Sequence, residues 1–201
     1  MTGRVRSLVF VSAGVVLVGV VWGLIWGLLT PGIDGRMVAP NKAVATGDTT
    51  TDFTAIGVYF AVAMIAGVIL ALVFWMPPKL RGPAGVAGLA FGAIAAGIIA
   101  VWVGDLVARL RFPGRDGVPV DGDFTQAPSL RMSDAYLDIG GGIGFSWALL
   151  VVAPLTALLT YLVLVVMNRS GDLGSPDDPA PVVSRRSRPT RYRTPDPMTR
   201  Q

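Results

Sequence analysis

The chain has 201 residues, of which 52% are hydrophobic and only 15% are charged. A soluble domain carries about 25% charged residues, so this composition excludes an ordinary water-soluble fold and indicates a protein of the lipid bilayer. The chain contains neither Cys nor His, which excludes disulfides and thiol nucleophiles and removes the commonest general base and metal ligand. The net charge is +4, but the basic residues lie in short segments beside apolar stretches, so we expect them to set membrane topology rather than to bind nucleic acid.

Four apolar stretches without any Asp, Glu, Lys or Arg follow one another along the chain. They cover about residues 8–29, 53–76, 84–104 and 143–167. Each has about 21–25 residues, enough to cross a hydrocarbon core of about 30 Å at about 1.5 Å per helical residue. The first stretch is too long for a cleaved signal peptide, and no A-x-A cleavage site follows it, so we expect it to persist as a helix.

The charges of the connecting segments predict the orientation. Residues 1–7 and 77–83 each carry two basic residues and no acid, whereas 30–52 and 105–142 carry more Asp than Lys and Arg. Because cytoplasmic segments are enriched in Lys and Arg, we expect a multi-pass protein with both termini in the cytoplasm. The predominance of Arg over Lys and the many Ala, Gly and Val residues indicate a bacterial protein, so we expect it in a bacterial plasma membrane. Four tryptophans then fall near the outer interface, where amphipathic rings are favoured: Trp22, Trp26, Trp102 and Trp147.

Small residues recur at every fourth position of the first and third stretches. This spacing lets two helix backbones approach closely, which is a main source of helix association in lipid. Two interpretations are open: packing inside one four-helix bundle, which we favour, and an interface with another copy of the chain or another membrane protein. The residues are Gly19, Gly23 and Gly27 in the first stretch and Gly88, Gly92, Ala96, Ala100 and Gly104 in the third.

Two local features concern the helices themselves. Pro154 interrupts the fourth stretch, where it removes a backbone donor and predicts a static kink. Thr51 or Asp52 directly precedes the second stretch, and we expect one of them to cap that helix with its side-chain oxygen.

The second outer loop, 105–142, is longer than a simple connection requires. Asp105 and Arg109 are four residues apart, a favourable helical pair, so we expect the third helix to continue to about Leu110. The remaining acids of this loop fit no EF-hand spacing, so we interpret them as solvated rather than as a calcium site. They are Asp116, Asp121, Asp123, Asp134 and Asp138. The glycines at 140–142 and 144 predict a flexible entry into the fourth helix rather than a nucleotide loop.

The segment 168–201 is rich in Pro, Ser, Asp and Arg and holds too little apolar surface to fold, which predicts a disordered tail. A polybasic segment beside a membrane attracts anionic headgroups. We therefore expect the tail to contact anionic lipid through Arg185, Arg186, Arg188, Arg191 and Arg193.

These patterns predict an all-α membrane protein, a four-helix transmembrane bundle with a longer second extracytoplasmic loop and a disordered C-terminal tail. Residues 1–7 would form the cytoplasmic N-terminus, 8–167 the transmembrane domain and 168–201 the cytoplasmic tail.

Two segments carry a resemblance. The first helix ends in Trp26-Gly-Leu-Leu-Thr-Pro-Gly32, and the fourth carries Trp147 and then Val151-Val-Ala-Pro-Leu-Thr-Ala-Leu-Leu-Thr-Tyr-Leu162. In these the chain resembles a family of small, uncharacterised four-span membrane proteins of mycobacteria and related actinobacteria, a domain of unknown function. The resemblance covers the membrane part. It implies the four-span topology and an actinobacterial host, and it assigns no catalytic residue.

Three functions remain open. We favour a structural or accessory cell-envelope protein without enzymatic activity, cofactor or metal, which acts through the bilayer, a membrane-protein partner or further copies of itself. The alternative is an oligomeric small transporter or channel subunit, although the ionisable residues that mark such pathways are missing from the apolar stretches. An enzyme acting from outside would have to bring five residues together near the interface: Asp105, Arg109, Arg111, Asp134 and Asp138.

Overall fold

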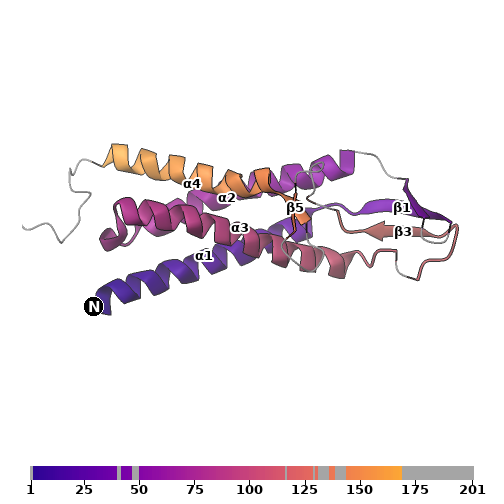
Figure 1. Ribbon diagram of the computed structural model, residues 1–201, viewed down its shortest axis with the longest axis horizontal. Helices are drawn as coiled ribbons and strands as arrows, with labels where there is room; N and C mark the ends of the chain where they lie inside the picture. The colour runs from indigo at the N-terminus through magenta and orange to yellow at the C-terminus, as the bar shows by residue number, and fades with distance from the viewer. Residues whose placement is uncertain are drawn as a thin grey trace, which may run out of the picture.

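The computed structural model describes residues 2–39, 42–46, 50–115, 117–128, 130, 136–138 and 144–168. Four long helices form an elongated bundle: α1 (Thr2–Leu29), α2 (Thr50–Trp75), α3 (Pro83–Arg111) and α4 (Trp147–Met167) (Figure 1). All four are long and apolar enough to cross a membrane. The predicted four-helix membrane fold is therefore confirmed.

The two ends of the bundle differ. The N-terminus of α1, the C-terminal end of α4 and the short 3-10 helix η1 (Pro78–Leu80), which joins α2 to α3, lie at one end, here called the termini end (Figure 1). Small β-sheets lie at the other, here called the sheet end (Figure 1). Because an even number of helices returns the chain to its starting side, the described parts of both termini share one end.

Two helix boundaries differ in how well the sequence predicts them. Helix α3 continues to Arg111, and Arg109 Nε lies 2.7 Å from Asp105 Oδ2, so the expected helical pair forms. Helix α2 begins at Thr50, which places Thr51 and Asp52 inside its first turn. The prediction that one of these two residues occupies the cap position is therefore wrong, because the helix starts earlier than the apolar stretch does.

Helices α1 and α3 pack backbone against backbone. A Cβ atom on Gly19 would lie 2.8 Å from the carbonyl oxygen of Ala96, and one on Gly23 would lie 2.5 Å from that of Ala100. Gly27 repeats this contact with Gly104, at 2.8 Å. Real Cβ atoms do not approach so closely, so only glycine permits this contact, and dispersion between the two backbones stabilises it.

The other two small residues of the α3 series meet a side chain of α2. The ring of Phe74 would lie 3.3 Å from a Cβ on Gly88 and 3.1 Å from a Cβ on Gly92. Within this chain, the small-residue series of α3 thus faces two neighbours: the backbone of α1 towards the sheet end and the Phe74 ring towards the termini end.

Trp22 and Trp26 lie inside the bundle, each only 2% exposed. Their rings pack against Tyr59, with centroids 4.9 and 6.1 Å away. These two rings face the core rather than the surface of the bundle, because glycines make room for them: a side chain on Gly104 would collide with the ring of Trp26. The other two tryptophans of that set lie on the exposed surface of the bundle, as expected for lipid-facing rings: Trp102 and Trp147.

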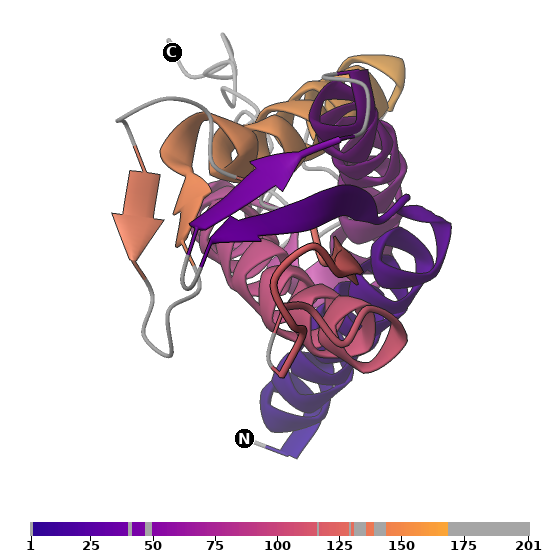
Figure 2. The ribbon, with the colours of Figure 1, turned by 90° about the vertical axis from the view of Figure 1, so that its right-hand side faces the viewer.

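A three-stranded antiparallel sheet covers the sheet end. Its central strand is β1 (Ile33–Ala39), flanked by β2 (Lys42–Ala45) and β3 (Asp123–Gln126). Figure 2 looks onto this end, with β1 and β2 crossing in front of the helix ends. Since β1 and β2 follow α1 while β3 follows α3, the sheet joins two interhelical loops that the sequence presents as separate and irregular.

A second, two-stranded sheet pairs β4 (Tyr136–Asp138) with β5 (Gly144–Ser146), and β5 leads directly into α4. The expected flexible glycine entry lies partly outside the described residues, but Gly144 itself belongs to this strand. Pro154 lies buried within α4, where the sequence placed it.

Candidate functional site

The sheet at the sheet end has a polar face built by its strand register. Asp34 stands opposite Thr125, and Arg36 stands opposite Asp123. The hydroxyl of Thr125 donates to Asp34 Oδ1 at 2.7 Å, and Arg36 Nε lies 3.7 Å from Asp123 Oδ1. Because alternate residues of a strand share a face, these four side chains gather on one side of the sheet.

The intervening residues of the same strands form the buried face. Met37 and Phe124 are 7% and 9% exposed. Gly35 lies beneath the Phe124 ring, so closely that a Cβ there would be 2.5 Å from the ring atom Cζ. The alternation therefore gives the small sheet one face that packs and one that meets water.

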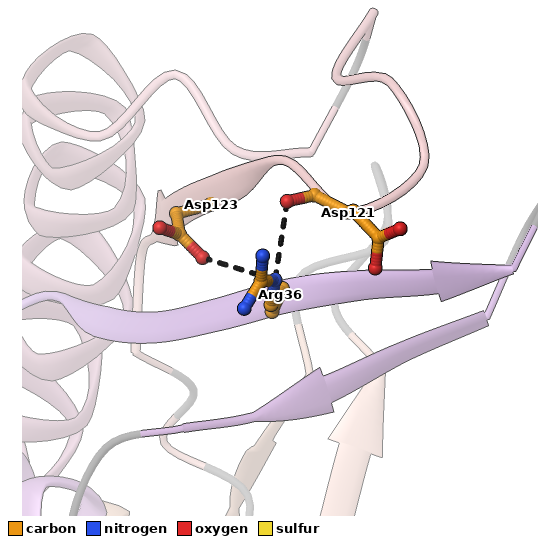
Figure 3. A network of polar contacts seen from close by, with 3 residues as sticks. All are labelled: Arg36, Asp121 and Asp123. Carbon is orange, nitrogen blue, oxygen red and sulfur yellow. Dashed lines mark hydrogen bonds and ion pairs between the residues drawn. The ribbon is translucent and has the colours of Figure 1, made fainter.

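The turn that precedes β3 is attached to β1 by its backbone. Asp121 N donates to Met37 O at 2.7 Å, and Met37 N donates to Gly122 O at 3.0 Å. Asp121 has a φ of 68°, a left-handed conformation that Asp tolerates better than most residues. Its carbonyl oxygen also accepts a hydrogen bond from Arg36 Nε at 3.1 Å, so Arg36 lies between Asp121 and Asp123 (Figure 3).

Arg111 at the end of α3 caps the C-terminus of α1. Its Nη1 donates to the carbonyl oxygens of Gly27, Leu28 and Thr30 at 2.8, 2.6 and 3.3 Å. The last carbonyls of a helix lack partners within the helix and carry partial negative charge, so a cation there satisfies both needs. This clamp fixes the point where α1 passes into β1.

An open hollow of about 860 Å³ lies among these elements. Four charged side chains line it, two acidic and two basic: Asp34, Asp123, Arg36 and Arg111. The hydroxyl-bearing residues Thr46 and Thr125 and the apolar residues Phe112, Pro113, Val118 and Phe124 complete much of its wall. This hollow, here called the outer pocket because it lies at the sheet end, presents charges of both signs and hydrogen-bonding groups.

The structure does not gather the five residues that an outer-face enzyme would need. Asp105 and Arg109 pair with each other along α3, whereas Arg111 binds the end of α1. Asp138 lies in β4, and Asp134 lies outside the described residues.

The other candidate site residues from the sequence concern metal ligands and the arginine-rich tail. Among the described residues, no group of three or more acidic side chains is arranged to hold a metal ion. Asp116 and the arginine cluster of the tail, Arg185, Arg186, Arg188, Arg191 and Arg193, lie outside the described residues.

The outer pocket is not evident from the sequence. Its polar residues look like ordinary loop charges, although the run Ile33-Asp-Gly-Arg-Met-Val-Ala39 alternates polar and apolar side chains at 34–37. That alternation is the signal of a half-buried strand. It is short, and the partner strand β3 lies about 90 residues away in sequence, as the 91-residue separation between Thr125 and Asp34 shows.

One family model matches residues 15–175, which is most of the chain; it describes a protein of unknown function, DUF2567. The chain belongs to the DUF2567 family. No curated protein and no solved structure matches it. The DUF2567 match spans both segments that build the outer pocket and ends before the tail arginines at 185–193. The expected membership in a family of unknown function is thus confirmed, and the actinobacterial host stays a prediction.

Proposed function

We propose that this DUF2567 protein is an accessory protein of the cell envelope that presents its sheet end to a protein partner outside the cytoplasm and performs no reaction of its own. The observation that supports the proposal is the separation of charge from the membrane part. Residues 8–29, 53–76, 84–104 and 143–167 contain no Asp, Glu, Lys or Arg, whereas charged side chains of both signs line the outer pocket. Membrane pathways for ions and protons usually contain ionisable residues, so the bundle resembles a scaffold.

The sheet offers a second contact beside the pocket. All four residues of β2 are exposed, and β2 is an edge strand of the sheet. Val38 and Val44 on β1 and β2 are 49% and 52% exposed. An exposed edge strand with apolar side chains can take up an extended segment of another protein.

The orientation belongs to the same proposal. Residues 1–7 and 77–83 carry basic residues and no acid, and both segments belong to the termini end. The positive-inside rule therefore supports a cytoplasmic termini end and an outward sheet end in the plasma membrane of a bacterium. The predominance of Arg over Lys and the family resemblance favour an actinobacterium.

Site-specific photo-crosslinking in native membranes tests the proposal. A photoreactive residue at Thr46, which lines the outer pocket, is expected to give a discrete adduct of higher mass. The matched control is the same residue at Leu159 of α4, which is 63% exposed on the helix surface and should meet lipid. A pocket position that gives no protein adduct at native expression, or the same adducts as position 159, would refute the proposal.

A transporter or channel subunit is the alternative, and one observation favours it. The hydroxyl groups of Tyr59 and Tyr161 are buried in the bundle with no hydrogen-bond partner among the described residues, so polar groups are available inside the membrane part. Large side chains such as Trp22 and Leu70 fill the core of the single bundle, so a pathway would have to form between copies. A native mass that corresponds to a single chain in mild detergent, together with no ion flux in liposomes, would exclude this alternative.

A further inference from the structure

We infer that the groove between α1 and α3 at the termini end binds one anionic phospholipid, with an acyl chain in the groove and the phosphate near Arg81. This site lies at the opposite end from the outer pocket and does not depend on the function proposed for that pocket.

The groove exists because the backbones of α1 and α3 are in direct contact over only part of their length. The glycine contacts of α1 with the α3 backbone run from Gly19 to Gly27, and they hold the two backbones together towards the sheet end. Before Gly19 the helix carries larger residues at the facing positions, such as Val11 and Val15, and Figure 1 shows the first turns of α1 diverging from the other helices. The result is a wedge-shaped space of about 450 Å³.

The lining of this groove is almost entirely apolar. It comprises five residues of α1 between Leu8 and Val16, seven of α3 between Ala84 and Ile99, and the side chains of Phe74 and Leu80. The volume lies in the range of small-ligand sites, roughly 300–1,000 Å³. Because the groove runs along two membrane-spanning helices, a hydrocarbon chain is the occupant that the surrounding bilayer supplies.

The basic residues at the termini end favour lipids with an anionic headgroup. Residues 1–33 and 53–104 contain four basic residues and no acid. All four belong to the termini end: Arg4, Arg6, Lys79 and Arg81. Within these two segments, the charged residues at the termini end are all positive, which complements an anionic headgroup.

Arg81 is held in place next to the groove. Leu80, its neighbour in sequence, lines the groove, and the carbonyl of Leu80 lies so close to Gly85 that a side chain there would collide with it. The guanidinium group of Arg81 lies 4.7 Å from the centre of the Trp75 ring, and its Nε donates to Trp75 O at 3.0 Å. The Arg81 charge is thus fixed at the C-terminal end of α2, one residue away from the groove-lining Leu80.

Two further positions contribute positive potential at the same mouth. The exposed Arg6 precedes the groove residue Leu8 by two residues in α1. Helix α3 begins there with Pro83 at its first position, and Ala84 and Gly85 of its first turn line the groove. The partial positive charge of the α3 N-terminus therefore adds to that of the arginines.

Native mass spectrometry with added lipid tests the inference. The purified full chain is titrated with phosphatidylglycerol and, separately, with phosphatidylcholine of the same acyl composition. We expect one tightly bound phosphatidylglycerol and weaker binding of phosphatidylcholine. Loss of one charge in Arg81→Gln should weaken phosphatidylglycerol binding about fivefold, which corresponds to about 1 kcal/mol per charge near a membrane surface. Arg81→Lys should retain most of the preference.

Two matched pairs of variants distinguish lipid bound in the groove from lipid bound elsewhere on the chain. Ala95→Phe places a ring in the groove, while Ala61→Phe adds the same ring to an exposed position of α2 outside it. Arg109→Gln removes one positive charge at the sheet end and controls for Arg81→Gln. A thermal melt of each variant shows whether it is folded.

We expect Ala95→Phe to abolish the tight lipid while Ala61→Phe and Arg109→Gln leave it unchanged. Equal affinity for the two lipids in the wild-type chain would overturn the inference. So would unchanged phosphatidylglycerol binding in Ala95→Phe, since the tail arginines would then account for it. A wild-type dimer that Ala95→Phe converts to a monomer would show that a second copy of the chain, and not lipid, fills the groove.

Discussion

The close contact of α1 with α3 makes Gly23→Ala a sharp test of the packing. The added methyl carbon would lie 2.5 Å from the carbonyl oxygen of Ala100 and 2.8 Å from Cβ of Val103, whereas ordinary contact begins at 3.4 Å. The first of these contacts is short by about 0.9 Å and involves backbone, which cannot rotate away. The helices must therefore separate over several turns.

A separation of this size forfeits about a quarter to a half of the dispersion energy of each contact in the interface. Overpacking of this kind costs about 1–3 kcal/mol, and the better helix propensity of alanine returns up to about 1 kcal/mol. We expect a net loss of about 1–2 kcal/mol in the free energy of unfolding. The measurement is the unfolding midpoint in mild detergent, followed by circular dichroism.

Gly57→Ala is the matched control, because a Cβ at Gly57 on α2 meets nothing within 4 Å. It makes the same chemical change in another membrane helix and should leave stability equal or slightly higher. If Gly23→Ala proved as stable as Gly57→Ala, the two backbones would not be in contact at Gly23 and the reasoning would fail.

Three other predictions follow from single contacts. Arg111→Gln should lower the free energy of unfolding by about 1–2 kcal/mol, because the last carbonyls of α1 lose their cap. Arg109→Gln breaks only a half-exposed ion pair and should change the free energy of unfolding by less than about 1 kcal/mol. Chemical unfolding of both variants measures the difference. Tyr59→Phe removes a buried hydroxyl without a partner among the described residues and should leave stability unchanged or raise it. Trp26→Phe loses a 2.9 Å hydrogen bond and ring volume, so it should lower stability. Equal melting temperatures for the two variants would contradict this contrast. Gly35→Val should unfold the small sheet while the helices persist, seen as faster hydrogen exchange confined to the strands; unchanged exchange there would show that the strand does not lie against a ring.

The membrane part of the fold could be predicted because each helix is encoded by its own local stretch of sequence. An uncharged run of sufficient length has to be a helix in lipid, where each backbone donor and acceptor needs an internal partner. The extension of α3 to Arg111 was also local, since Asp105 and Arg109 form their pair within one turn. The burial of Trp22 and Trp26 was not local: it depends on space left by Gly104 of another helix.

The sheet end could not be predicted because its structure depends on contacts between segments that are distant in the sequence. Strand β1 has seven residues, β2 and β3 have four each, and their pairing joins segments that lie far apart in sequence. Nothing in either loop alone identifies the partner of Asp34 or Arg36. The clamp of Arg111 on α1 likewise appears only when the two helix ends are placed side by side.

Cysteine accessibility in spheroplasts tests the central claim, that a bilayer separates an outward sheet end from cytoplasmic termini. The chain has no native Cys, so each single variant reports one position without background. Val44→Cys lies in β2 at the sheet end, and Pro78→Cys lies in η1 at the termini end; both positions are exposed. A membrane-impermeant maleimide should label Val44→Cys in intact spheroplasts and Pro78→Cys only after permeabilisation. The reverse pattern would invert the orientation, and labelling of both variants from outside would contradict the four-span arrangement itself.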